Sequence, residues 1–332
     1  QEGKVRTESL FWCRMDKQLN LVKPSTREFF TESKKLGRYG VIDWLHGYVY
    51  GRWAYFYIGM GTGEHTLVKK FKPVAEVIYR VFRLLTGSSR KHAGKDLSFA
   101  DTYHGKVVPL ENARKLVTLD RPIELPDLER VIPYKRARDL ILHNPDHIVA
   151  LECPCRSVRE QPCLPLDVCL IVGEPFASFI LEHHGPVKAR AITQQEALNI
   201  LEEENQRGHV AHAFFKDAML DRFYAICNCC SCCCGAMQAQ RNGTPMLASS
   251  GYVCRLDEQN CVNCGDCVSM CQFAAIDLDR EPRIDEQACM GCGVCVNTCA
   301  HEALSLVRDP ARGEPLEIHR LMEEYGNKEM AN

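Results

Sequence analysis

The sequence predicts an α+β protein of several domains, with a cysteine-rich α/β domain in the middle and a smaller C-terminal domain with a pseudo-twofold internal repeat. Two observations support this prediction. Short apolar runs typical of buried strands alternate with helical patterns through the middle of the chain. In addition, the 20 cysteines of the 332 residues are concentrated in three short blocks, and the last block contains the same unit twice.

The composition indicates metal binding in a reducing compartment. Disulfide scaffolds spread their cysteines along the chain, whereas metal sites cluster them as they are clustered here. We therefore expect a cytoplasmic protein, in an anaerobe because clustered thiols oxidise readily. The net charge of −2 does not favour nucleic acid as a partner. A polar start and the lack of any apolar run of about 18 residues predict neither a signal peptide nor a transmembrane helix.

Four segments are expected along the chain. Residues 1–133 form an N-terminal aromatic and basic region that ends in a proline-rich linker. Residues 134–250 form the cysteine-rich α/β domain, and residues 251–310 form the repeated domain. Residues 311–332 form a C-terminal helical tail.

The N-terminal region leaves two interpretations open. Aromatic residues crowd into residues 44–57, which favours a buried core or a subunit interface, while peripheral membrane contact is the second interpretation. Basic residues are frequent in residues 69–95. These charges are typical of a solvated face, and the alternative is a docking surface for an acidic redox partner or for anionic lipid headgroups.

The middle domain shows a regular alternation of strand and helix patterns. A capping box from Thr193 to Glu196 predicts a helix that ends before Gly208. Strands are expected at residues 148–151, 168–172, 210–215 and 223–226, and further helices at residues 134–142 and 174–182.

Ten cysteines of the middle domain are candidate ligands of one or two additional iron–sulfur clusters. Thiolates at such density repel one another unless a cation neutralises them, and a zinc site with four thiolates is the alternative. Arg156 and Arg159 follow the first of these cysteines and are expected to donate hydrogen bonds to cluster sulfurs or to raise the reduction potential of the cluster. The candidate ligands are Cys153, Cys155, Cys163, Cys169, Cys227, Cys229, Cys230, Cys232, Cys233 and Cys234.

Two of the expected strands lead directly into cysteines of this set. The two groups of cysteines that follow these strands are therefore expected at one edge of a sheet. The strand at 148–151 precedes Cys153 and Cys155, and the strand at 223–226 precedes Cys227 and Cys229. In each case the two cysteines are separated by one residue, which places both sulfurs on one side of an extended backbone. We therefore expect these four residues among the ligands of one cluster.

The C-terminal repeat carries two cysteine runs of identical spacing. The heptapeptide at residues 255–261 is matched by the one at 283–289, and each copy continues as C-x2-C-x2-C-x3-C. Glycines between the cysteines permit the positive φ angles that a loop around a cluster requires, and the fourth cysteine is expected to begin a short helix. Cys254 stands apart from both runs and is expected to be an ordinary buried thiol.

This part of the chain resembles the bacterial two-cluster ferredoxins, and the remainder matches no family known to us. The resemblance implies two [4Fe-4S] clusters, each completed by the fourth cysteine of the other run. Gln272 and Ala300 stand where that family has proline after the fourth cysteine. The implied ligands are Cys261, Cys264, Cys267 and Cys299 for the first cluster and Cys289, Cys292, Cys295 and Cys271 for the second.

Two functions follow from these motifs. The chain shows no nicotinamide fingerprint and no phosphate-binding loop, which favours an electron-transfer subunit of an oxidoreductase over a stand-alone enzyme. Such a subunit relays electrons between a redox protein and a larger complex. The alternative is an oxidoreductase whose substrate binds an unusual cluster in the middle domain. An iron without a cysteine ligand would favour the enzyme, and full cysteine ligation would favour the relay.

Overall fold

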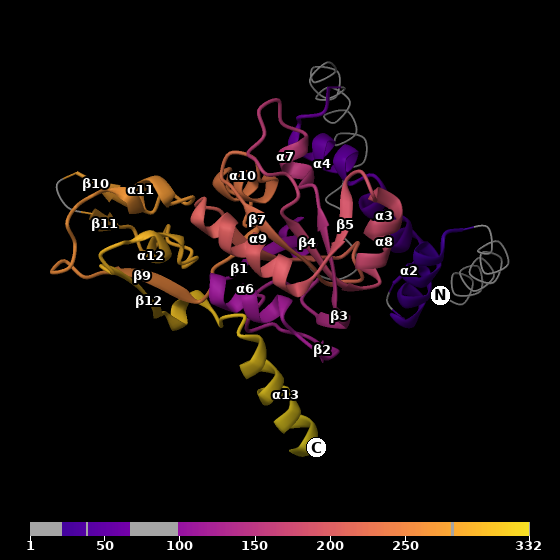
Figure 1. Ribbon diagram of the computed structural model, residues 1–332. Helices are drawn as coiled ribbons and strands as arrows, with labels where there is room; N and C mark the ends of the chain where they lie inside the picture. Colours follow the sequence, from indigo (N-terminus) through magenta and orange to yellow (C-terminus); the bar gives the residue numbers. More distant parts are fainter. Residues whose placement is uncertain (1–21, 38, 67–98, 280–281, 332) are drawn as a thin grey trace, which may run out of the picture.

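The computed structural model describes residues 22–37, 39–66, 99–279 and 282–331. The basic residues within 69–95, for which a docking surface was one interpretation, lie outside the described residues. The described part is a mixed α+β structure with one large sheet and a smaller C-terminal unit beside it (Figure 1).

The large sheet has eight strands in the order β2-β3-β4-β7-β6-β1-β8, and β5 also pairs with β3. All pairs are antiparallel except the parallel pair of β1 and β8. The strands are β1 (Tyr103–Val107), β2 (Ile123–Leu125), β3 (Leu140–Leu151), β4 (Cys169–Glu174), β5 (Ala189–Ile192), β6 (Val210–Lys216), β7 (Arg222–Cys229) and β8 (Leu247–Ala248).

Helices cover both faces of this sheet and create two apolar cores. Along β3, Val149 and Leu151 belong to one core while Ile148 and Ala150 belong to the other, as the alternation of side chains along a strand requires. The first core includes α2 (Pro24–Lys35), α3 (Val41–Arg52) and α8 (Phe176–His184). The second includes α6 (Leu110–Val117), α9 (Gln194–Gln206) and α13 (Ile318–Ala331).

The aromatic N-terminal segment belongs largely to the first core. Phe30, Trp44 and Tyr50 are buried, whereas Trp53 and Phe56 remain about half exposed. The interpretation as core therefore applies to the inward faces of α2 and α3. Among the described residues, no helix combines the length and the apolar character needed to cross a bilayer.

Two local differences from the sequence prediction have clear physical reasons. The helix expected at residues 134–142 is wrong, because Leu140 and Leu142 are buried two residues apart on the same face of β3. The segment expected as a linker supplies β2, and the N-terminal region supplies β1 to the same sheet and the helix α6 that packs against it. The expected cap of α9 is confirmed, since the amide of Glu196 donates to Thr193 Oγ1 over 3.1 Å.

The C-terminal unit consists of two small antiparallel sheets and two short helices. Strand β9 (Tyr252–Leu256) pairs with β12 (Leu304–Arg308), and β10 (Ile276–Leu278) pairs with β11 (Pro282–Ile284). Helix α12 (Val294–Thr298) contacts α9, and Val294 packs against strands β1 and β6. Helix α13 then returns to the main body, where it contacts α6 and β2. The smaller unit thus lies beside the main body and contacts it through α12, and the chain after the unit returns to the body through α13 (Figure 1).

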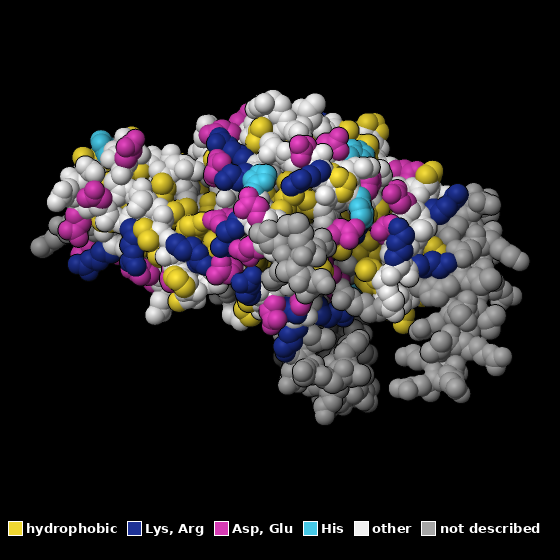
Figure 2. Space-filling view, turned by 90° about the horizontal axis from the view of Figure 1, so that it is seen from below, with side chains coloured by type: hydrophobic (Ala, Val, Ile, Leu, Met, Phe, Trp, Pro, Cys, Tyr) yellow, Lys and Arg dark blue, Asp and Glu magenta, His cyan; other side chains and the backbone are white. Residues whose placement is uncertain are grey.

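The surface carries charges of both signs. Basic and acidic side chains are interspersed on the face shown in Figure 2. Several charged side chains pair, as Arg320 of α13 does with Glu317 and Glu324. Such exposed pairs contribute little to stability, on the order of 0–1 kcal/mol each. The apolar cores therefore dominate the stability of the fold.

The close approach of α3 to the loop after β6 gives a test of this packing. A Cβ at Gly47 would lie 2.2 Å from the carbonyl oxygen of Ala218 and 2.7 Å from Phe29 Cζ. Gly47→Ala should therefore cost about 1–3 kcal/mol and lower the melting temperature measured by circular dichroism under anaerobic conditions. In Gly61→Ala, where no atom lies within 4 Å of the new Cβ, stability should be unchanged or higher by roughly 0.5–1 kcal/mol. Equal melting temperatures for the two variants would contradict the described packing.

Candidate metal centres

Eight cysteines of the middle domain line one cavity beneath the N-terminal helices, and six of them form one group, while Cys230 and Cys233 belong to a second group described below. Within the group of six each thiol interacts electrostatically with the next, from Cys227 through to Cys229. We call this group the six-thiol site. In order of contact its members are Cys227, Cys169, Cys153, Cys155, Cys234 and Cys229.

The sheet topology explains why these residues meet. Strands β3 and β7 flank β4 and both run antiparallel to it, so β3 and β7 are parallel and end at the same edge of the sheet. Strand β4 begins at that edge with Cys169, which lies directly opposite Cys227 in the register. The expected meeting of two cysteine groups at one edge is therefore confirmed, and Cys169 joins them.

The expected geometry of the paired cysteines holds for one pair only. Cys227 and Cys229 lie two residues apart in β7, so they share a face of the sheet. Cys155 instead lies in the short helix α7 (Pro154–Ser157), because Pro154 suits the first helical turn and ends the extended backbone. The Cys155 thiol still contacts Cys153, and both pairs line the same cavity.

The cavity is also lined by aromatic and apolar residues that the sequence analysis did not assign to the site. Tyr50 from α3 and Ile58 from α4 (Ala54–Thr62) line it, together with Tyr103 and Tyr224 of the sheet. The hydroxyls of Tyr50 and Tyr224 lie 2.7 Å apart, and burial raises the pKa of both phenols far above the usual range. In the sequence, the N-terminal aromatic residues were noticeable through their crowding in residues 44–57. This crowding did not indicate which cavity they would cover.

A cation is required for these thiols to act as ligands. The contact with Cys155, together with burial, raises the pKa of Cys153 to about 12. The thiols therefore keep their protons near neutral pH unless a metal displaces them, and metal binding must release protons. A buried set of six sulfur donors suits iron–sulfur chemistry, because soft thiolates select such clusters.

Arg156 is fully buried beside the six-thiol site. Its guanidinium donates to Glu204 Oε2 over 2.6 Å, to the carbonyl of Pro165 over 2.6 Å and to the carbonyl of Asn228 over 2.9 Å. These partners differ from the cluster sulfurs that the sequence analysis expected. Arg159 likewise donates to the carbonyl of Cys233 and pairs with Glu64. The two arginines thus hold the cysteine-bearing loops through their backbones.

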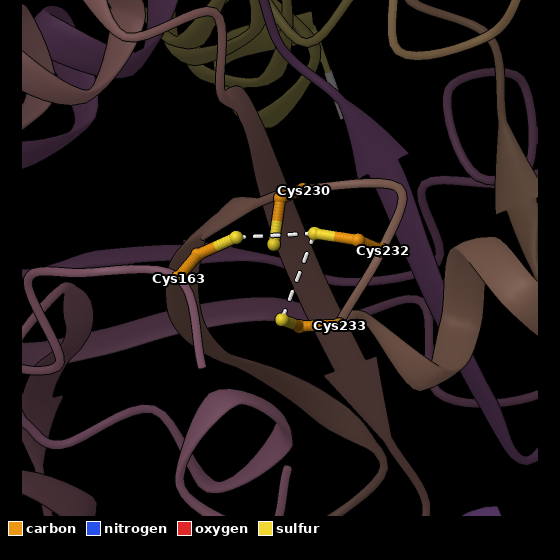
Figure 3. A group of neighbouring side chains, drawn as sticks. All are labelled: Cys163, Cys230, Cys232 and Cys233. Carbon is orange, nitrogen blue, oxygen red and sulfur yellow. Dashed lines mark hydrogen bonds between the residues drawn. The ribbon is translucent and has the colours of Figure 1, made fainter. Parts of the chain in front are cut away.

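The other four cysteines of the middle domain form a second, more compact group (Figure 3). We call it the four-thiol site. All four Sγ atoms lie within 4.8 Å of one another, and they come from the loop before β4 and the loop after β7. The ten candidate cysteines are therefore divided into six and four. The members of the four-thiol site are Cys163, Cys230, Cys232 and Cys233.

The C-terminal unit contains two further cavities lined by cysteines. Each is lined by the first three cysteines of one run and the fourth of the other, which is the exchange that the ferredoxin resemblance implied. The first cavity is lined by Cys261, Cys264, Cys267 and Cys299, and the second by Cys289, Cys292, Cys295 and Cys271.

The loops around these cavities have the backbone that the glycines predicted. Gly265, Gly291 and Gly293 all adopt positive φ angles. The expectation that the fourth cysteine begins a helix is wrong, because Cys271 and Cys299 instead follow the ends of α11 (Asp266–Met270) and α12.

Cys254 lies within the second cavity and is more than an ordinary buried thiol. Its Sγ is 3.6 Å from Cys295 Sγ, and its amide donates to Cys289 Sγ over 3.5 Å. The amide of Ala275 donates similarly to Cys271 Sγ over 3.3 Å. Backbone amides aimed at ligand sulfurs offset the negative charge of a bound cluster.

Comparison with known families agrees with this geometry. Residues 260–303 match the family model of the 4Fe-4S dicluster domain, and no family model matches the rest of the chain. A search of the curated proteins finds no match. The chain is therefore an iron–sulfur protein with a dicluster domain near its C-terminal end. Such a domain indicates a redox or electron-transfer role.

The buried ion pair beside the six-thiol site yields a stability prediction. Burial alone would raise the pKa of Glu204, but His209 and Arg156 lower it below the usual range. Its contribution to stability is therefore present above the pKa of the unfolded carboxyl and is lost as the pH falls through the folded value. Glu204→Gln leaves Arg156 without a buried anion and should cost about 3–5 kcal/mol in anaerobic denaturant unfolding at neutral pH.

The neighbouring residue provides the control for this prediction. The Glu203 side chain is 59% exposed and pairs only with Arg207 at the surface, so Glu203→Gln should change stability by less than about 1 kcal/mol. If the two variants unfolded at the same denaturant concentration, the buried ion pair of Arg156 and Glu204 would not stabilise the structure beside the six-thiol site as described.

Proposed function

We propose that this chain is an iron–sulfur electron-transfer protein or subunit that relays electrons between a redox protein and a larger oxidoreductase complex. In this proposal the two C-terminal cavities each hold a [4Fe-4S] cluster with the four cysteines that line them, and the six-thiol site holds an additional iron–sulfur cluster. Bound clusters of this kind accept and donate single electrons. The observation that carries the proposal is that Phe273 and Met290, which line the second C-terminal cavity, pack against the apolar core that contains the six-thiol site.

Aromatic packing connects the two sites through the protein interior. His212 lies opposite Cys227 in the register of β6 and β7. Its ring packs against Phe273 with centroids 6.4 Å apart, and Phe273 lines the second cavity together with Cys271. Met290 also lines that cavity and packs against the core that contains the six-thiol site. Closely packed side chains between two redox centres favour electron transfer because it depends steeply on distance.

A hydrogen bond between the loops supports the same connection. The amide of Ser231, in the loop after β7, donates to Gln272 Oε1 over 2.8 Å. Gln272 follows Cys271 directly and stands where the ferredoxins have proline. The residue that departs from the ferredoxin pattern therefore makes a contact between the two parts of the chain, and a proline there would lack the side-chain acceptor.

The number of thiols favours the relay over the enzyme. A cubane cluster needs four cysteine ligands, and the six-thiol site offers more than that. Full ligation would leave no iron open to a substrate as a Lewis acid. The cavity lining is also apolar, with buried side chains such as Tyr224 and Phe214. An oxidoreductase with a substrate-binding cluster remains the alternative function.

The proposed surroundings follow from the same chemistry. Exposed thiols such as Cys232 and the cysteines of the dicluster domain are vulnerable to oxidation, so we propose the cytoplasm of an anaerobe as the location. The partner is proposed to be a protein with its own redox centre. Peripheral contact with a membrane through the N-terminal region remains the second interpretation of its half-exposed aromatic residues.

The iron content of the intact chain tests this proposal. Two cubanes supply about eight irons per chain, so anaerobically prepared protein should contain clearly more than eight. Cys155→Ser removes one member of the six-thiol site and should lower the iron content toward about eight, while the electron paramagnetic resonance signals of the dicluster domain persist. Ser157→Ala, in the same short helix, should retain all the iron. An iron content of only about eight in the unaltered chain would refute an additional cluster.

A further inference from the structure

The four-thiol site differs from the other cysteine sites in its dimensions. Cys163 Sγ lies 3.1 Å from Cys232 Sγ, and Cys232 Sγ lies 3.7 Å from Cys233 Sγ. Figure 3 shows the four side chains converging on one small space from two loops. Each C-terminal set instead surrounds a cavity. The four-thiol site therefore suits a bound metal group that is smaller than a cubane cluster.

The spacing matches a single tetrahedral metal ion. Sulfur atoms bound to zinc at about 2.3 Å in a tetrahedron lie about 3.8 Å apart. The Cys232–Cys233 Sγ separation falls near this value, the Cys163–Cys232 separation is shorter, and the largest separation in the set is within 4.8 Å. A cubane binds each cysteine to a different iron and so requires a wider set of sulfurs.

The chemistry of the site also favours zinc. Four thiolates and no other donor type form the closed ligand set of a structural zinc site, and zinc binds such ligands more tightly than ferrous iron does. The guanidinium of Arg159 donates to the Cys233 carbonyl over 3.1 Å and brings a positive charge next to the site.

The site lies in a loop that contacts the C-terminal unit. Gln238 of α10 (Gly235–Arg241) donates to the carbonyl of Cys232 over 2.8 Å, and Arg241 donates to the carbonyl of Ser231 over 3.2 Å. The Ser231 amide, between two of the cysteines, donates to Gln272. A metal ion at this position would fix the loop that joins the two redox parts of the chain.

We propose that Cys163, Cys230, Cys232 and Cys233 bind one Zn²⁺ ion, separate from every iron–sulfur site of the chain. This inference goes beyond the relay, because it removes four of the ten middle-domain cysteines from iron ligation and assigns them a structural role. The six-thiol site is then the place for additional iron. The zinc content and the iron content are independent readouts, so failure of one proposal is distinguishable from failure of the other.

The test measures zinc, iron and sulfide in the intact chain prepared anaerobically from zinc-containing medium. The unaltered protein should contain about one zinc per chain, and X-ray absorption at the zinc edge should show four sulfur ligands at about 2.3 Å. Cys163→Ser and Cys232→Ser should each lose most of the zinc, with unchanged iron and sulfide. Ser231→Ala, in the same loop, should retain both metals because its backbone contacts persist.

Three outcomes would overturn the zinc site. The first is unaltered protein without zinc. The second is zinc whose absorption spectrum shows nitrogen or oxygen ligands. The third is a loss of iron from Cys163→Ser or Cys232→Ser, which would make these cysteines ligands of an iron–sulfur cluster. The spectrum of the unaltered protein decides the first two outcomes even if a variant does not fold.

Discussion

The arrangement of the metal centres depends on the parallel alignment of β3 and β7 on either side of β4. Each of these strands leads into cysteines, and antiparallel pairing with the same central strand brings both ends to one edge of the sheet. Cys169 opens β4 at that edge. Without this alignment the thiols would lie at opposite ends of the sheet, more than a strand length apart. The six-thiol site is therefore a consequence of topology.

Other parts of the structure cover this edge of the sheet and connect it to the C-terminal unit. Helices α3 and α4 place Tyr50 and Ile58 over the thiols, and the buried pair of Arg156 and Glu204 holds the adjoining loops. A weakly polar cavity strengthens the interaction between thiolates and a metal. On the other side, Phe273 and Gln272 bring the second C-terminal cavity against the sheet. The N-terminal helices and the C-terminal unit thus both pack around the part of the sheet that carries the six-thiol site.

The sequence predicted the parts of the site that depend on local spacing. Repeated cysteine runs and their glycines were sufficient for the C-terminal cavities, because their loops are built from neighbouring residues. The division of the ten middle cysteines into six and four was not predictable. It depends on the register that sets Cys169 opposite Cys227 and on a loop that carries Cys163 to Cys232. Pro154 starts a helix between Cys153 and Cys155, so the prediction that these two cysteines lie on an extended backbone is wrong.

The central claim is that the six-thiol site and the second C-terminal cavity hold redox centres in close electronic contact. Electron paramagnetic resonance of the fully reduced, intact chain tests it directly, because nearby unpaired spins split or broaden one another's signals. The account predicts that the spectrum contains an interaction between the additional cluster and the dicluster domain, and that Cys155→Ser abolishes this interaction while the dicluster signals remain. A spectrum that equals the sum of independent, unperturbed clusters would contradict the account.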